Sequence, residues 1–161
     1  MSAAPWDELV TGPSVTCYLS MADEPPTGPL IHALEKRGIR VAVPIMRPGR
    51  QLVWGWHGQP LAVNGYGVAE PPEDTTVALD SMSAMIIPAL RAGRDGSRMG
   101  RGAGYYDRAL AQVRRHDHGG PLRIVIVYDD EVDDAVPCQP HDAPIDVIVT
   151  PTTVYRVTAQ P

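Results

Sequence analysis

The residues best suited to chemistry lie in one short segment, 98–108, in which glycines alternate with other side chains. Gly100, Gly102 and Gly104 stand at every second position, and Arg98 and Arg101 are interleaved with them. Glycine lets the backbone approach a ligand closely and adopt positive φ, so that successive N–H groups can point into one concavity. Arginine offers planar donors that match phosphate or carboxylate oxygens. The pattern therefore predicts a loop that binds an anion.

A carboxylate, Asp107, follows the loop close to the start of a predicted helix. A helix N-terminus favours anions, and an aspartate beside it could hold a divalent cation that bridges phosphate oxygens. The spacing is not that of a Walker loop, because no Gly-Lys-Ser/Thr follows, and it is not the Gly-x-Gly-x-x-Gly dinucleotide fingerprint. A plain surface turn before an ordinary helix is the alternative interpretation of the same residues.

Positive charge is concentrated around this loop in an otherwise acidic chain. The net charge is −5, and Lys36 is the only lysine. Nonspecific affinity for nucleic acids or anionic membranes requires distributed positive charge, so the composition argues against both partners. The arginines near the loop are Arg91, Arg94, Arg98, Arg101 and Arg108. We expect a local anion site rather than a basic surface.

The chain of 161 residues has the size of a single domain with one core. Cys17 and Cys138 lie in unrelated contexts, which gives neither a disulfide framework nor paired metal-ligand spacing. No apolar run approaches the ~20 residues that cross a bilayer, and the first residues do not resemble a signal peptide. These features predict a cytoplasmic protein, which we expect to be a monomer.

Strands and helices alternate along the predicted structure. The apolar, β-branched runs that predict strands span residues 15–19, 40–44, 84–90, 123–128 and 147–150. Helical spacing is found over 27–37 and in a stripe of Tyr106, Leu110 and Val113 that continues through Arg115. This alternation predicts an α/β fold, a three-layer α/β/α sandwich with a mostly parallel sheet.

Ligands of such sheets bind beyond the carboxyl ends of the strands, where we expect the glycine loop and residues 129–130. Residues 52–63 predict a hairpin or a loop excursion, in which Trp54 and Trp56 serve packing rather than ligand binding. His116 and His118 could face a metal, but without a third ligand nearby a solvated loop is favoured.

Five segments, in one order, together resemble a known family. They are Tyr18-Leu-Ser-Met-Ala-Asp-Glu24, Gly67-Val-Ala-Glu-Pro71, Ile86-Ile-Pro-Ala-Leu90, the glycine loop with its Tyr-Tyr-Asp, and Pro137-Cys-Gln-Pro-His-Asp142. The chain resembles the 5-formyltetrahydrofolate cyclo-ligases, also called methenyltetrahydrofolate synthetases, from about residue 15 to residue 150. Gly-Arg-Gly-x-Gly-Tyr-Tyr-Asp is the most specific element of the likeness.

The resemblance implies an ATP- and Mg²⁺-dependent ring closure of 5-formyltetrahydrofolate to 5,10-methenyltetrahydrofolate, with release of ADP and phosphate. The formyl oxygen is a poor leaving group, so its phosphorylation by ATP gives an activated species that folate N10 attacks. The protein would mainly position the reactants and stabilise charge.

The resemblance also assigns roles to residues. ATP binding falls to Arg98, Gly100, Arg101, Gly102, Ala103, Gly104, Tyr105 and Tyr106. Arg101 and Tyr105 are the implied catalytic residues, and Asp107 and Asp142 the implied magnesium ligands. Substrate binding falls to Leu19, Glu24, Tyr66, Arg101 and Tyr105.

Several of these residues have a structural alternative. Leu19 could be core at the end of a strand, and Glu24 could solvate the turn before Pro25. Asp142 could be a turn residue, and Tyr66, between two glycines, could fill a loop.

The sequence differs from the family pattern in two places. Members of the family usually begin with a basic helix that reaches the ATP phosphates, and this helix has no counterpart here. Ala103 occupies a position that is often glycine or lysine in the family. We therefore expect a single cyclo-ligase-like domain, 1–161, without that helix. An active ligase is the favoured hypothesis. A folate-binding paralogue without catalysis is the second, and a non-enzymatic, RNA-contacting module is the third.

Overall fold

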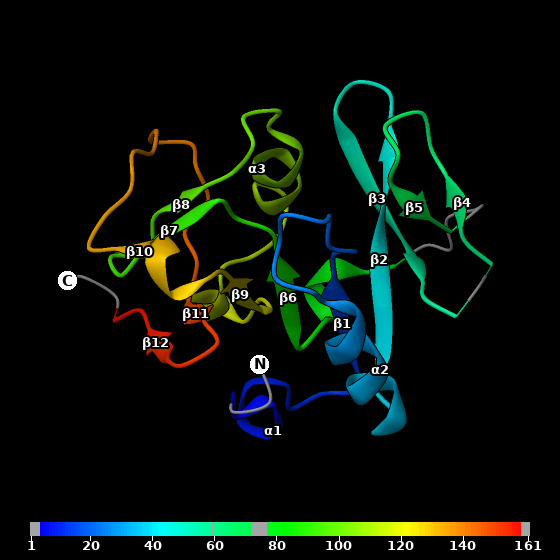
Figure 1. The fold of residues 1–161 in the computed structure, drawn as a ribbon, viewed down its shortest axis with the longest axis horizontal. Helices are drawn as coiled ribbons and strands as arrows, with labels where there is room; N and C mark the ends of the chain where they lie inside the picture. Colours follow the sequence, from blue (N-terminus) through cyan, green and yellow to red (C-terminus); the bar gives the residue numbers. More distant parts are fainter. Residues whose placement is uncertain (1–3, 59, 72–76, 159–161) are drawn as a thin grey trace.

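A seven-stranded mixed sheet forms the centre of the protein (Figure 1). The computed structural model describes residues 4–58, 60–71 and 77–158. The strands, in their order across the sheet, are β12 (Val154–Arg156), β11 (Val147–Val149), β9 (Leu122–Ile126), β6 (Ala84–Ile87), β1 (Ser14–Cys17), β2 (Arg40–Arg47) and β3 (Gln51–Trp56). The five inner strands are parallel, and the two edge strands, β12 and β3, run antiparallel to their neighbours.

Helices cover both faces of this sheet. The helices α1 (Trp6–Leu9) and α2 (Gly28–Lys36) share one apolar cluster with the sheet, and α3 (Tyr105–Leu110) belongs to the other. In β6 the alternation is plain, because Ala84 and Ile86 pack in the first cluster and Met85 and Ile87 in the second. The predicted three-layer α/β/α sandwich with a mostly parallel sheet is confirmed.

The first predicted strand–helix–strand unit is formed by β1, α2 and β2. The buried side chains of α2 are Leu30, Ile31 and Leu34, which lie at helical spacing and cover the sheet. Pro29 suits the first turn of the helix, where its missing N–H costs nothing. The helix ends before Gly38, whose φ of 77° is easily reached only by glycine. The chain then returns as β2, parallel to β1.

A hairpin that the sequence did not predict stands between β6 and the glycine loop. The predicted strand 84–90 ends at Ile87, and β7 (Arg91–Gly93) and β8 (Arg98–Met99) follow as an antiparallel pair. Gly96 makes their turn with a φ of 92°. The strand β10 (Val132–Asp133) pairs with β7 to complete a three-stranded sheet. The glycine loop therefore leaves β8 rather than a strand of the main sheet.

The helix that follows the loop is shorter than predicted. Helical spacing predicted continuation through Arg115, but α3 ends at Leu110, and Gln112 and Val113 make i to i+3 bonds instead. The buried guanidinium of Arg123 donates to the carbonyls of Leu110 and Val113 at 3.2 and 2.9 Å. These side-chain bonds satisfy carbonyls at the end of the helix.

The excursion after β2 contains two hairpins. Residues 51–56 form β3, and β4 (Ala62–Val63) pairs with β5 (Ala69–Glu70). Trp54 is buried and meets Tyr106 edge to face, with ring centroids 6.4 Å apart. Trp56 lies beneath the guanidinium of Arg40, 3.7 Å from it. Packing, the predicted role, is confirmed for Trp54, and for the partly buried Trp56 it stays a prediction.

The remaining short elements are three 3-10 helices, η1 (Leu79–Ser81), η2 (His116–His118) and η3 (Asp129–Glu131). In η2, His116 Nδ1 lies 3.2 Å from the carbonyl oxygen of Gly120, and both histidines are exposed. Within the described residues, no cluster of three or more His, Cys, Asp or Glu side chains could hold a metal, and no helix is long and apolar enough to span a bilayer.

The two cysteines differ sharply in exposure, which predicts their reactivity. Cys17 lies fully buried in β1, and burial raises the pKa of its thiol far above the usual value, whereas Cys138 is exposed. With excess thiol reagent, we expect Cys138 to react in the native protein and Cys17 only after denaturation. Mass spectrometry of the labelled peptides checks the order. Fast native labelling of Cys17 would contradict the buried position of β1.

Candidate active site

The glycine loop, residues 100–104, joins β8 to α3 and leaves several donors unused. Gly102 and Gly104 adopt positive φ, 87° and 78°, and Gly104 caps the N-terminus of α3. The backbone N–H groups of Gly102, Ala103 and Gly104 make no hydrogen bond to any described residue. Because peptide N–H groups are obligatory donors, this loop can accept an external anion or water.

Gly100 is required for a different reason, the close approach of a side chain. A Cβ atom at this position would lie 2.9 Å from Nη1 of Arg98, so the arginine occupies the space that a larger residue would need. The guanidinium therefore packs directly under the start of the loop.

Arg98 is buried and holds two parts of the site together. Its side chain is 3% exposed, and it donates to Asp107 Oδ1 at 2.7 Å and to the carbonyl oxygen of Pro88 at 3.1 Å. The Nε atom is buried without a partner in the described chain. The predicted phosphate donor thus lies beneath the loop, and it fixes the carboxylate that was predicted to bind magnesium.

Arg101 projects from the loop toward the segment after β1. Its Nη2 atom donates to both carboxylate oxygens of Asp23 at 2.9 Å and lies 3.4 Å from Glu24 Oε1. The hydrogen bond from Arg101 holds the pKa of Asp23 below its usual value. The structure thus brings together Arg101 and Glu24, two of the predicted residues, which are far apart in the sequence. Asp23 was not among the predicted residues.

The segment after β1 is held in place by a small hydrogen-bond network. Thr27, fully buried, donates to the carbonyl oxygen of Tyr18 at 2.7 Å, and Ser20 and Thr27 exchange bonds between backbone N–H and hydroxyl. These bonds tie the end of β1 to the start of α2 and close the intervening loop. Glu24, whose side chain is 9% exposed, accepts from the N–H of Met21 at 2.7 Å.

The structure is compatible with both interpretations of Glu24 and Leu19, that is, with a role in substrate binding and with a structural role. Glu24 closes the turn through Oε2 and reaches Arg101 through Oε1. Leu19 is half-buried and packs on the edge of the cluster beneath α2, at the carboxyl end of β1. Their predicted roles in substrate binding therefore stay predictions.

Two tyrosines meet at the far side of the loop. Tyr105 begins α3, and loss of hydration, followed by the neighbouring Tyr66 hydroxyl, raises its pKa above the usual value. Tyr66 sits in the turn between β4 and β5, where Asn64 Oδ1 accepts from the N–H groups of Tyr66 and Val68. Its side chain is 71% exposed, so it projects from its loop rather than filling it.

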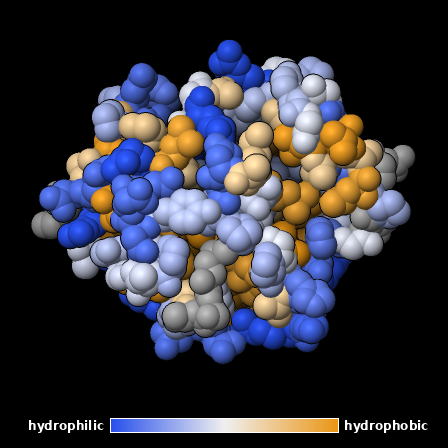
Figure 2. All heavy atoms as spheres, viewed as in Figure 1, coloured by the Kyte–Doolittle hydropathy of each residue, from blue (hydrophilic) through white to orange (hydrophobic). Residues whose placement is uncertain are grey.

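Apolar side chains gather over the β4–β5 hairpin, as Figure 2 shows on the same side as these strands in Figure 1. Leu61 and Val63 are 41% and 72% exposed. The hairpin is anchored to the body of the protein by Glu70, which accepts from Met46 N–H at 2.9 Å and from Asn64 Nδ2 at 3.1 Å. An apolar surface thus adjoins the polar glycine loop.

Asp142, the second predicted magnesium ligand, lies in the loop after β10. Its Oδ2 accepts from the N–H of Gln139 at 2.6 Å, and Oδ1 lies 3.6 Å from His141 Nε2. No interaction joins Asp142 to Asp107 in the described chain. Oδ2 of Asp107 accepts no hydrogen bond from the described chain, and a cation at Oδ1 of Asp142 would displace only the contact with the exposed His141, so the donor chemistry fits magnesium. The pairing of the two carboxylates stays a prediction.

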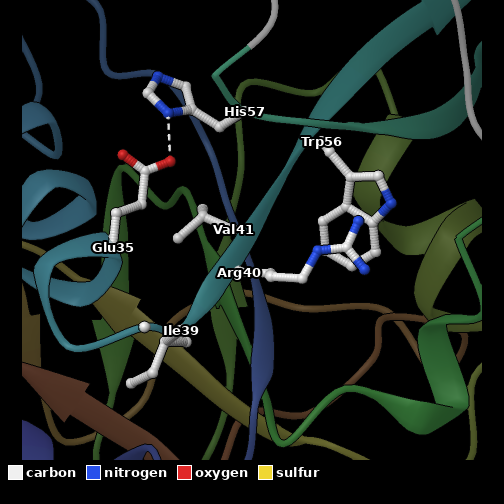
Figure 3. Close-up of a pocket in the computed structure, with 7 residues that line it drawn as sticks. Glu35, Ile39, Arg40, Val41, Trp56 and His57 are labelled. Carbon is white, nitrogen blue, oxygen red and sulfur yellow. Dashed lines mark hydrogen bonds and ion pairs between the residues drawn. The ribbon is translucent and has the colours of Figure 1, made fainter.

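A groove of about 320 Å³ lies at the opposite end of the sheet (Figure 3). It is lined at the start of β2 and the end of β3 by Arg40, Val41, Trp56 and His57, and His57 Nδ1 lies 2.7 Å from Glu35 Oε1. None of the residues that the sequence predicted for the site lines this groove. We therefore place the candidate active site at the glycine loop.

The carboxyl end of β9 was also expected near the ligand. Asp129 accepts from the hydroxyls of Thr150 and Thr152 at 2.5 and 2.7 Å, which holds the ends of β9 and β11 together. The backbone carbonyl of Asp130 accepts from Arg91 at 3.2 Å. In the described structure both residues therefore fasten loops.

The three-layer α/β/α sandwich carries a glycine loop with free N–H groups between a β-hairpin and a helix, an arrangement typical of α/β proteins that bind anionic ligands. Comparison with known proteins narrows the class. The 5-formyltetrahydrofolate cyclo-ligase family model matches residues 3–151. The chain belongs to this family.

Individual relatives agree with this assignment. The chain is 33% identical over 150 residues to the 5-formyltetrahydrofolate cyclo-ligase of Mycolicibacterium smegmatis, covering 88% of this chain and 75% of the relative. It is 29% identical over 154 residues to that of Escherichia coli, covering 92% and 83%. The NMR structure of Aquifex aeolicus 5,10-methenyltetrahydrofolate synthetase superimposes with a TM-score of 0.77 at 25% identity, covering 99% of this chain and 78% of that one. Family and relatives together support a cyclo-ligase activity.

Proposed function

We propose that this protein closes the ring of 5-formyltetrahydrofolate to 5,10-methenyltetrahydrofolate at the expense of ATP and with Mg²⁺. The observation that carries the proposal is the glycine loop, whose free N–H groups at Gly102, Ala103 and Gly104 stand beside Arg101. Backbone amides and a guanidinium carried by one loop are the kinds of donor that stabilise a transferring phosphoryl group. Family membership supplies the substrate.

The reaction needs the formyl oxygen to become a leaving group. Its attack on the γ-phosphorus of ATP forms the C–O–P link and releases ADP. Folate N10 then adds to the formyl carbon and loses its proton to water, and the C–O bond breaks with departure of phosphate, which leaves the methenyl bridge. Magnesium would neutralise charge on the phosphates. The residues of this chain bind, orient and shield the reactants.

Arg101 would steady the transferring group. In the free protein its charge is held by Asp23 and Glu24, and an incoming phosphate would compete with these carboxylates for the same guanidinium. Glu24 would then be free to accept a hydrogen bond from a pterin nitrogen. The exchange would link nucleotide binding to folate binding.

Tyr105 and Tyr66 would contact the folate on the other side of the loop. Their side chains meet above an apolar hairpin surface, which suits the flat rings of a pterin and an aminobenzoyl group. Asp107 and Asp142 would hold magnesium through their free oxygens, with Arg98 orienting Asp107. Because Arg98 binds Oδ1 of Asp107, Oδ2 of the same carboxylate would bind the metal.

The direct test mixes the protein with ATP, MgCl₂ and 5-formyltetrahydrofolate and follows methenyl absorbance and ADP together. We expect both products in a one-to-one ratio, with none when ATP or magnesium is omitted. Saturable folate binding without either product would instead identify a binding protein without catalysis, and would overturn the proposal.

A further inference from the structure

Three arginines beside the candidate active site have no carboxylate partner in the described chain. They are Arg47 at the end of β2, Arg50 in the turn to β3, and Arg108 in α3, and we call them the arginine cluster. The chain has thirteen arginines. Eight of them pair with a carboxylate of the described residues. Arg40 lies over Trp56, and Arg123 is buried against carbonyls.

The cluster is held together by backbone contacts rather than by charges. Arg108 Nη1 donates to the carbonyl oxygen of Gly49 at 3.3 Å, which joins α3 to the β2–β3 turn. Arg47 Nη1 donates to the carbonyl oxygen of Met46 at 3.2 Å. Each of these bonds uses one donor of a guanidinium that carries five, so most donors of the cluster remain open. Among the described residues, these three positive charges have no carboxylate partner, in a protein of net charge −5.

Arg50 has an unusual backbone conformation for its side chain. Its φ is 57°, the only positive φ of a non-glycine residue in the described chain. A side chain in this region costs conformational energy that glycine would avoid. Arg50 therefore keeps its guanidinium at this turn in spite of the cost.

The cluster adjoins the residues that would contact folate. Burial and the neighbouring Tyr66 raise the pKa of Tyr105, and the positive charge of Arg50 acts against this rise. Arg108 lies three residues beyond Tyr105 on the same helix, whose first turn faces the β2–β3 turn. Along the chain, Tyr105 therefore lies between the glycine loop and Arg108. A ligand that covers both tyrosines would reach the cluster with one end.

We propose that the arginine cluster binds the carboxylates at the glutamate end of the folate substrate. This inference rests on the proposed function, because it takes the folate as the ligand at Tyr105. Folate ends in a glutamate with two carboxylates, and each further glutamate adds one. Arginine forks match carboxylates in charge and in geometry. The cluster is thus a subsite that favours folates with more than one glutamate.

The binding test uses p-aminobenzoyl-triglutamate, which has no pterin and cannot react. Calorimetry of the wild-type protein is expected to show binding that weakens with added salt. Arg47→Gln and Arg108→Gln should each raise Kd about fivefold, within the range of partly exposed charge-assisted bonds. Arg50→Gly removes the charge and relieves the backbone, so it should weaken binding without loss of folding stability. The matched control is Arg156→Gln, which removes an exposed arginine of β12 that pairs with Glu8 of α1.

Steady-state kinetics of the same variants distinguish a failure of the carboxylate subsite from a failure of the proposed function. The cluster variants should raise KM for triglutamyl substrate more than for monoglutamyl substrate and leave KM for ATP unchanged. Normal turnover with no change in folate KM or in Kd would overturn the subsite and leave the function intact. An increase confined to the KM for ATP would also overturn it, because the cluster would then bind phosphates. Cluster-dependent triglutamate binding without turnover would support the subsite while the proposed function fails.

Discussion

Replacing Arg101 with glutamine is expected to lower kcat about 10²- to 10³-fold, the effect of removing one preorganised donor to developing charge. The wild-type guanidinium reaches out of the glycine loop, is itself 43% exposed, and pairs with the exposed Asp23 and the largely buried Glu24 in the free protein. Its removal leaves the fold intact and takes away a positive charge near the transferring phosphoryl group. Saturating steady-state measurements of methenyl formation check the effect.

A second variant distinguishes catalysis from loss of the ion pair. Asp23→Asn breaks the same contact from the other side but keeps Arg101, so it should retain kcat near that of the wild type. Arg114→Gln, an exposed arginine that pairs with Asp80, controls for the loss of one charge. Equal losses in Arg101→Gln and Asp23→Asn would assign the effect to the ion pair. A kcat of Arg101→Gln within threefold of the wild type would remove Arg101 from the mechanism.

Replacing Arg98 with methionine is expected to destabilise the protein by roughly 3 kcal/mol, near the lower end of the range for breaking a buried pair. The lower end applies because Asp107 is 25% exposed and regains some hydration. The carbonyl oxygen of Pro88 also loses its donor. Urea denaturation followed by circular dichroism measures the change in the free energy of unfolding.

Asp107→Asn provides the matched comparison for this pair. The amide oxygen can still accept from Arg98, so we expect a smaller loss of stability than in Arg98→Met. The loss of the carboxylate should instead raise the magnesium concentration required for activity. If Asp107→Asn kept the wild-type magnesium dependence, Asp107 would serve only to neutralise Arg98. If Arg98→Met were as stable as the wild type, the buried pair would not hold the loop.

Local patterns predicted the fold well where neighbouring residues determine it. The β1–α2–β2 unit follows from one apolar strand, one amphipathic stripe and Gly38, all read within a short window. The hairpin of β7 and β8 was missed because its strands are very short and one of them, β8, begins with the buried Arg98. The end of α3 was missed because Arg123, distant in the sequence, determines it.

The candidate site was predictable in its local part only. Glycine spacing predicted the loop at 100–104, and positive φ at Gly102 and Gly104 agrees with that prediction. Asp23 could not be linked to Arg101, because 78 positions separate them and no local pattern relates the two. Similarly, the sequence predicted Arg98 as a phosphate donor, and its burial beside Asp107 depends on how β8 and α3 pack.

The proposed ligase activity depends on phosphate binding by the backbone N–H groups of the glycine loop. The most direct measurement is the NMR chemical shift of the amide groups of Gly102, Ala103 and Gly104 during titration with Mg²⁺ and a non-hydrolysable ATP analogue. We expect large, saturable changes in the chemical shifts of these three amides. The amide shifts of Gly38 and Gly58, which lie away from the loop, should change much less. Nucleotide binding that shifts other residues and leaves these three amides unchanged would contradict phosphate binding by the loop.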